Sequence, residues 1–217
     1  MADQDSFINE VTEEVRKDRL FRLFKRYGWI AIALVVIVVG GASVLEWQKA
    51  KARAEAEATG DALLAAIGNE TPEARRDALA AMETGGGAGQ AALIGLLQSA
   101  TAAEAGDTAA ARVTLLEIVE TAEAPEVYRD LARLKAALLP GGLPEERIKL
   151  LEPISAAGNP FRLLAIEQRA LAEIEMGQTE TAVETLRGIL ADADVTEGLR
   201  RRAGQLIVAL GGSPDES

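Results

Sequence analysis

A single uninterrupted apolar run constrains the fold more than any other feature. From Trp29 to Leu45 the chain reads WIAIALVVIVVGGASVL, with Ser43 as its one strongly polar side chain. At about 1.5 Å per residue a helix of this run spans roughly 25 Å, and extension to Tyr27 and Trp47 brings it to the roughly 30 Å of a bilayer core. Lipid cannot satisfy exposed backbone N–H and C=O groups, so one segment crosses a membrane only as a helix. The sequence therefore predicts a transmembrane anchor over residues 29–47.

A buried core helix and a cleaved signal peptide are the two other interpretations of this run. A core helix would seldom carry aromatic residues at both ends, whereas Tyr27, Trp29 and Trp47 match the aromatic belt of a membrane helix. A signal peptide has a short basic leader and a small-residue cleavage site. Here 28 residues precede the run, which ends in Leu45-Glu46-Trp47, although Gly41-Ala42-Ser43 is a short stretch of small residues. An uncleaved anchor explains the pattern better.

Basic residues are distributed unequally about the anchor, and this predicts its orientation. Six precede it, opposed locally by Asp18: Arg16, Lys17, Arg19, Arg22, Lys25 and Arg26. Three follow it, interleaved with acidic residues: Lys49, Lys51 and Arg53. Since Lys and Arg resist translocation, the N-terminus is expected in the cytoplasm and the rest of the chain on the far side. In a bacterium this places the protein in the inner membrane with its larger part in the periplasm, an oxidising compartment that suits a chain without cysteine.

Residues 5–27 read as one amphipathic helix before the anchor. Phe7, Val11 and Val15 follow one another at i, i+4 and i+8, which places them on one face. Two roles are open for this arm. It could lie on anionic lipid headgroups through its basic residues, or it could dock a cytoplasmic or membrane protein.

The arm also carries a family resemblance. The stretch Asp5-Ser6-Phe7-Ile8-Asn9-Glu10-Val11-Thr12-Glu13-Glu14-Val15-Arg16-Lys17-Asp18-Arg19-Leu20, with the basic Tyr27-Gly28-Trp29 start of the span, resembles a bacterial family. This family comprises membrane-anchored, tetratricopeptide repeat (TPR)-like ancillary subunits of the Sec translocon, and the likeness is to its alphaproteobacterial branch. The resemblance implies partners among translocon channel subunits, periplasmic chaperones and emerging client segments.

Beyond the anchor the chain is predicted to be helical throughout. Residues 46–58 alternate alanine with Lys, Arg and Glu, which are strong helix formers and poor strand formers. We expect a stalk helix as far as Ile67 and a further helix starting at Thr71-Pro72. The glycine run at residues 85–89 lacks the following Lys-Ser or Lys-Thr of a phosphate-binding loop, so we interpret it as a hairpin.

A repeat of 35 or 36 residues follows. Glycine, leucine and isoleucine recur with the same offsets at three sets of positions: Gly106, Leu115 and Ile118; Gly142, Leu151 and Ile154; Gly177, Leu186 and Ile189. Small Ala111 and Ala182 come five residues after the first and third glycines, whereas Arg147 breaks this pattern in the middle copy. A helix–glycine turn–helix unit of this length is typical of TPR arrays, in which each hairpin buries its apolar face against the next.

Taken together, these patterns predict an all-α protein: an N-terminal amphipathic helix, one transmembrane helix and a TPR-like α-hairpin solenoid. The expected parts are a cytoplasmic arm (1–28), the anchor (29–47), a helical stalk with the first hairpin (48–89), the repeats (90–210) and a disordered tail (211–217). Within the repeats, Pro153 should end or kink a helix near Glu152. A boundary explains this proline better than a gating kink.

The sequence contains no recognisable catalytic motif. The chain has no histidine and no cysteine, which removes most nucleophile–base pairs and zinc sites. The stretch from Asp192 to Gly198 faintly resembles a calcium loop, but Ala203 stands where the bidentate glutamate belongs, and a Thr196 helix cap explains these residues better. We expect no enzyme activity, no cofactor, no metal and no small-molecule substrate. The net charge of −11 argues against nucleic acid.

Noncovalent binding is what remains. Beyond the anchor the chain carries a net charge of about −10, so a concave TPR face would prefer basic or apolar segments, unless the acidic residues only keep the array soluble. With the family resemblance, the sequence predicts an ancillary translocon subunit that links the Sec channel to periplasmic chaperones during export. The alternative is a scaffold or assembly factor for another inner-membrane or envelope complex.

Overall fold

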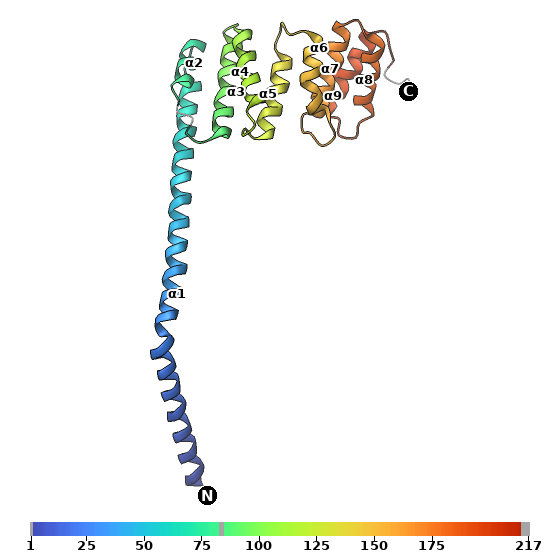
Figure 1. Cartoon of the computed structure of the whole chain (residues 1–217). Coiled ribbons are helices and arrows are strands. Elements are labelled where there is room, and N and C mark those ends of the chain that lie inside the picture. Colours follow the sequence, from blue (N-terminus) through green and yellow to red (C-terminus); the bar gives the residue numbers. More distant parts are fainter. Residues whose placement is uncertain (1, 83–84, 214–217) are drawn as a thin grey trace. The chain divides into compact units, whose positions relative to one another are not determined.

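The computed structural model describes residues 2–82 and 85–213, and every regular element in this part of the chain is a helix (Figure 1). Side chains are described from residue 33 onward and, before it, for Lys25 and Ile30. The predicted all-α fold class is therefore confirmed. The chain divides into two compact units, residues 1–58 and 59–217, and each is considered by itself. Residues 214–217 of the predicted disordered tail lie outside the described part.

The first unit consists of most of helix α1 (Ala2–Ile67), a helix of 66 residues. No proline precedes Pro72, so no residue in this stretch lacks the N–H that continues a helix. The helix ends at Ile67, as predicted for the stalk. Within the described residues it is the one helix long and apolar enough to cross a membrane, which is compatible with a single-pass anchor.

The apolar stretch of α1 from Leu34 to Leu45 has no protein cover. Between residues 34 and 45 every large aliphatic side chain is more than half exposed: Leu34, Val35, Val36, Ile37, Val38, Val39, Val44 and Leu45. The Ser43 hydroxyl donates a hydrogen bond to the Val39 carbonyl oxygen (2.8 Å), so this polar group is satisfied inside the helix. Burying an aliphatic side chain of this size is worth about 1.5–3 kcal/mol, and soluble monomers rarely expose so large a contiguous apolar surface. Lipid is the environment that this surface suits.

The second unit is a row of helices (Figure 1). After the end of α1 come α2 (Pro72–Ala80), α3 (Ala88–Glu104), α4 (Thr108–Glu120), α5 (Glu126–Leu138), α6 (Pro144–Leu151), the 3-10 helix η1 (Glu152–Ser155), α7 (Arg162–Glu175), α8 (Thr179–Ala191) and α9 (Glu197–Ala209). Each helix from α2 to α9 packs against the next one, and α3 also contacts α5, which contacts α7. Consecutive helices therefore form hairpins, and alternate helices share one face of the array.

Helix boundaries follow the predicted signals. The Thr71 hydroxyl accepts a hydrogen bond from the Ala74 N–H, with Pro72 at the first position of α2. The Thr196 hydroxyl accepts one from the Leu199 N–H at the start of α9, which confirms the cap predicted there. Pro153 lies in η1 directly after α6 ends, so the predicted helix end near Glu152 is also confirmed.

The buried core is divided into three clusters, one for each hairpin and the helix that follows it. Leu115 and Ile118 lie in the cluster of α3, α4 and α5, and the equivalent pairs lie in the other two clusters: Leu151 with Ile154, and Leu186 with Ile189. All six side chains are buried. Because each cluster draws on a helix of the next hairpin, no hairpin completes its core alone.

The middle turn differs from the other two. Three residues separate α3 from α4 and α7 from α8, and five separate α5 from α6. Gly106 and Gly177 adopt the left-handed conformation (φ 81° and 74°), but in the middle turn this residue is Gly141 (φ 85°) and not Gly142. The predicted spacing therefore selects the wrong turn glycine there. Gly142 serves another need, because a Cβ at this position would lie 2.8 Å from Nη1 of Arg112.

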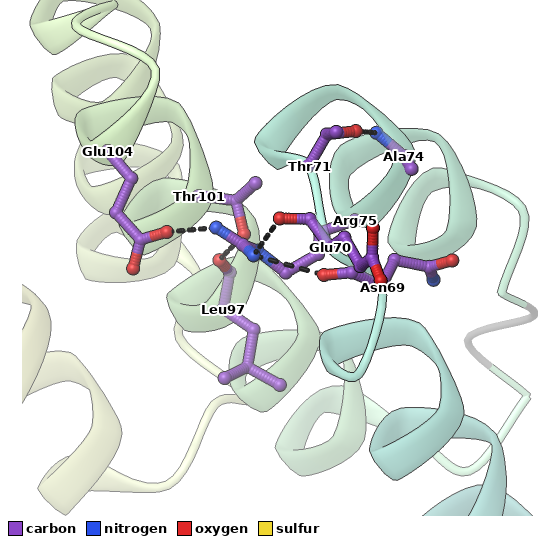
Figure 2. A network of polar contacts seen from close by, with 8 residues as sticks. All are labelled: Asn69, Glu70, Thr71, Ala74, Arg75, Leu97, Thr101 and Glu104. Atoms are coloured by element: carbon purple, nitrogen blue, oxygen red, sulfur yellow. Dashed lines mark hydrogen bonds and ion pairs between the residues drawn. The ribbon is translucent and has the colours of Figure 1, made fainter.

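An arginine near the start of each of α2, α4 and α6 reaches the C-terminal end of the next α-helix, which is α3, α5 and α7 respectively. Arg112 of α4 donates to the carbonyl oxygens of Ala136 (3.0 Å), Leu139 (2.9 Å) and Pro140 (3.2 Å), and Arg147 of α6 donates to Glu175 (2.7 Å). Figure 2 shows the first member, Arg75, which donates to the carbonyl oxygens of Asn69 and Glu70 and to the carboxylate of Glu104. A cation at a helix C-terminus pairs with orphan carbonyls and with the helix dipole. These arginines tie neighbouring hairpins together.

Candidate functional site

The residues predicted to set the membrane anchor lie on α1. The side chain of Trp47 is exposed, as a membrane-facing aromatic must be in the free chain. The side chains of Tyr27 and Trp29 lie outside the described residues. The sixth member of the predicted basic cluster, Lys25, is exposed. The side chains of the other five also lie outside the described residues: Arg16, Lys17, Arg19, Arg22 and Arg26. The aromatic belt and the positive-inside orientation stay predictions.

The array carries an open groove on the face shared by α5, α7 and α9. Its volume is about 710 Å³, within the usual range of ligand sites. Its lining is mostly apolar: Leu134, Leu138, Leu164, Leu171, Leu206 and Ala209, with the polar Glu167, Gln168, Arg202 and Gln205. Leu138 is 54% exposed and Leu164 is 41% exposed, so the groove presents apolar surface to solvent in the free chain. This arrangement can bind a partner, and we take the groove as the candidate site.

One ion pair crosses the groove between α7 and α9. Arg202 donates from Nε to Glu167 Oε1 (2.7 Å) and from Nη2 to Glu167 Oε2 (2.8 Å), a bidentate pair that occupies both carboxylate oxygens. The Glu167 side chain is buried, and its hydrogen bonds hold the pKa of Arg202 above the ordinary arginine value. Because the two charges neutralise each other, the groove offers no unpaired charge to a ligand.

Charge is spread unevenly over the array. Residues 59–126 contain 11 acidic and 3 basic side chains, whereas residues 127–213, which form α5, α7 and α9 almost completely, contain 12 acidic and 11 basic ones. The acidic excess expected for the binding face therefore lies mainly in the part of the array before α5. The groove itself lies in the nearly neutral part.

A second, smaller hollow of about 200 Å³ lies between α3 and α4. It is lined mainly by small or short side chains, among them Ala91, Gly95 and Thr114. Gly95 is in close contact here, since a Cβ on it would lie 3.0 Å from Cδ1 of Ile118. The hollow offers little apolar surface compared with the groove of α5, α7 and α9.

Sequence reasoning found the repeat positions but missed the groove. The predicted leucines, isoleucines and turn glycines hold the hairpins together and do not line it. The signal that could have shown it is that leucines not fully buried lie close to glutamines on alternate helices. Gln168 of α7 and Gln205 of α9 each stand in a turn of helix that also presents Leu164 or Leu206.

A comparison with known protein families matches residues 22–182, which is more than half of the chain, to the family described as tetratricopeptide repeat-like domain. No curated protein and no solved structure matches the chain. The family match agrees with the helical hairpins, the three core clusters and the turn glycines described above. The chain therefore belongs to the tetratricopeptide repeat-like domain family.

Proposed function

We propose that this protein is a single-pass inner-membrane scaffold whose repeat array binds protein segments where secreted proteins leave the Sec channel. The observation that carries the proposal is the combination, in one chain, of a helix whose aliphatic stretch from Leu34 to Leu45 has no protein cover and an array with an open apolar groove. TPR-like domains typically act as protein-interaction modules, which agrees with this combination. The resemblance of residues 5–20 to ancillary translocon subunits supplies the particular complex.

The mechanism is noncovalent. A membrane anchor confines the array to a thin layer next to the bilayer, which raises its effective concentration for any partner held there. A weak groove then suffices to hold an emerging segment long enough for a periplasmic chaperone to take it over. In this proposal the arm before the anchor contacts channel subunits or anionic lipid on the cytoplasmic side.

Affinity purification of the tagged full chain in mild detergent tests the partner assignment. The proposal predicts recovery of translocon channel subunits together with a periplasmic chaperone. Recovery of an unrelated membrane complex without channel subunits would contradict it and support the alternative function, a scaffold or assembly factor for another envelope complex.

Topology is tested separately. A reporter enzyme that is active only outside the cytoplasm, fused after Ser217, should be active, because the proposal places the array in the periplasm. A silent reporter fusion, with the same fusion active when targeted by a known export signal, would place the array in the cytoplasm and contradict the proposal.

A further inference from the structure

The polar groups of the groove limit what it can hold. Glu167 and Arg202 use their charges on each other, and the surrounding leucines can solvate no further charge. An acidic or basic side chain that entered this surface would lose water without gaining a partner of opposite charge. A ligand that complements the groove is therefore uncharged where it touches α5, α7 and α9.

The two glutamines indicate a peptide. Neither Gln168 nor Gln205 is hydrogen-bonded to another group in the described part of the chain, and each amide offers both a donor and an acceptor to the groove. The backbone of an extended peptide presents N–H and C=O groups that need such partners, whereas an acyl chain presents neither. Amides placed among leucines thus favour a polypeptide over a lipid tail.

The size of the groove indicates a short segment rather than a folded partner. Ten residues line it, whereas stable interfaces between folded proteins usually draw on about 20–30 residues a side. Three helices spaced by about 8–10 Å span roughly 20 Å, which corresponds to about six residues of extended chain. A second copy of this protein would cover the groove only in part.

We infer that the groove of α5, α7 and α9 selects an extended, uncharged, leucine-containing polypeptide segment, with Gln168 and Gln205 bonding its backbone and the Glu167–Arg202 pair excluding charged side chains. This inference rests on the proposed function, because it names the class of segment that the array binds. It adds that the acidic charge of the protein does not determine ligand choice at this site.

Peptide binding to the full chain in lipid nanodiscs tests the inference. The probes are three fluorescent peptides of about ten residues with blocked ends: one of leucine, serine and glutamine, and two in which a pair of serines is replaced by glutamate or by lysine. Fluorescence anisotropy should give the neutral peptide at least about tenfold tighter binding than either charged one. Equal or tighter binding of a charged peptide would overturn the inference.

Matched variants locate the binding. Leu164→Gln and Leu138→Gln change half-exposed groove residues, and each should weaken binding of the neutral peptide about tenfold or more. Leu143→Gln is the control, because Leu143 is 61% exposed and does not line the groove, and it should bind like the unchanged chain. Equal loss in the control, or no loss in both groove variants, would overturn the inference, with retained helicity by circular dichroism showing that each variant is folded.

Other occupants give different results. A fluorescent fatty acid that binds the unchanged chain but not Leu164→Gln would overturn the inference in favour of an acyl chain. A dimer that Leu164→Gln converts to a monomer would overturn it in favour of a second copy. If the neutral peptide is preferred but channel subunits are not recovered, the groove assignment stands and the translocon proposal fails. If channel subunits are recovered but the neutral peptide is not preferred, the translocon proposal stands and the groove assignment fails.

Discussion

Ile37 of α1 and Ile154 of η1 carry the same side chain in opposite surroundings. Ile37 is 73% exposed, whereas Ile154 is fully buried between α5, η1 and α7. The same contrast holds for the whole aliphatic stretch of α1 against the repeated leucines and isoleucines of the array. In the array, neighbouring helices bury the repeated apolar side chains, whereas no part of the protein covers the aliphatic stretch of α1. The comparison teaches that the hydrophobicity of a residue alone does not decide whether its helix suits a core or a bilayer. The arrangement of apolar residues along the helix does: a continuous run suits a bilayer, and residues that recur on one face suit a core.

The strongest way to break this contrast is to make α1 unsuitable for lipid. The double substitution Ile37→Arg/Val38→Arg should abolish stable membrane integration, because each arginine near the centre of a span costs about 2.5–3.5 kcal/mol on insertion scales. Membrane fractionation should move the variant out of the integral-membrane pellet.

Val113→Arg is the matched control for the anchor, since Val113 is also exposed but lies on α4 of the array. It should fractionate like the unchanged chain. Retention of the double variant in the integral-membrane pellet would show that lipid is not the solvent of α1.

In the array, the corresponding test removes a buried side chain and leaves a cavity, instead of introducing a charge. Ile154→Ala should lower the free energy of unfolding of the array by about 2–5 kcal/mol, because the side chain is fully buried where two hairpins meet. Thermal or urea unfolding followed by circular dichroism measures the loss, and membrane fractionation should not change. Val113→Ala serves as the exposed control and should shift the free energy of unfolding by about 0.5 kcal/mol or less.

A smaller loss is expected at the ties between hairpins. Arg112→Ala leaves three carbonyl oxygens at the end of α5 without their donor, and should cost about 1–3 kcal/mol of unfolding free energy. Arg201→Ala is the control, since this arginine of α9 is exposed and makes no hydrogen bond or ion pair among the described contacts. An equal effect of the two substitutions would remove the structural role assigned to Arg112.

The smallest effect is a pH dependence between α7 and α8. Arg162 donates two hydrogen bonds to Asp192 (2.7 and 3.0 Å), and together with the Asp194 N–H they hold the pKa of Asp192 below its ordinary value of 3.8. A lowered folded-state pKa contributes stability that is complete above the unfolded value and is lost as pH falls through the folded one. Asp192→Asn should therefore destabilise the array by a constant amount above about pH 5, and the difference should shrink below about pH 4.

Unfolding midpoints measured between pH 7 and pH 3 check this dependence. Asp61→Asn is the control, because this exposed aspartate makes no ion pair among the described contacts. A difference between Asp192→Asn and the unchanged chain that is as large at pH 3 as at pH 7 would contradict the role of the carboxylate charge.

Helix boundaries and repeat positions could be predicted because their signals are local. Thr71-Pro72, Pro153 and Thr196 act on the residues directly beside them, and the periodic leucines fall on one helix face in every copy. The middle turn could not be predicted from the period. Gly141 and Gly142 are adjacent and identical, but Gly141 adopts the left-handed conformation and Gly142 lies against the guanidinium of Arg112, a residue of another helix.

The groove could not be predicted from the sequence either, because it also depends on residues that are far apart in the chain. Leu138, Leu164 and Leu206 come from three helices and share a surface through the stacking of α5, α7 and α9. Arg147 is a similar case: in the sequence it breaks an alanine pattern, but in the structure it pairs with Glu175. Long-range neighbours such as these decide what an isolated residue does.

Alkaline carbonate extraction of membranes that contain the full chain tests the central claim most directly, because it strips proteins held by charge or by partners and leaves those embedded in lipid. The account predicts that the intact chain stays in the pellet. Release of the intact chain into the supernatant would contradict it, since the exposed aliphatic surface of α1 would then have to be covered by something other than the bilayer.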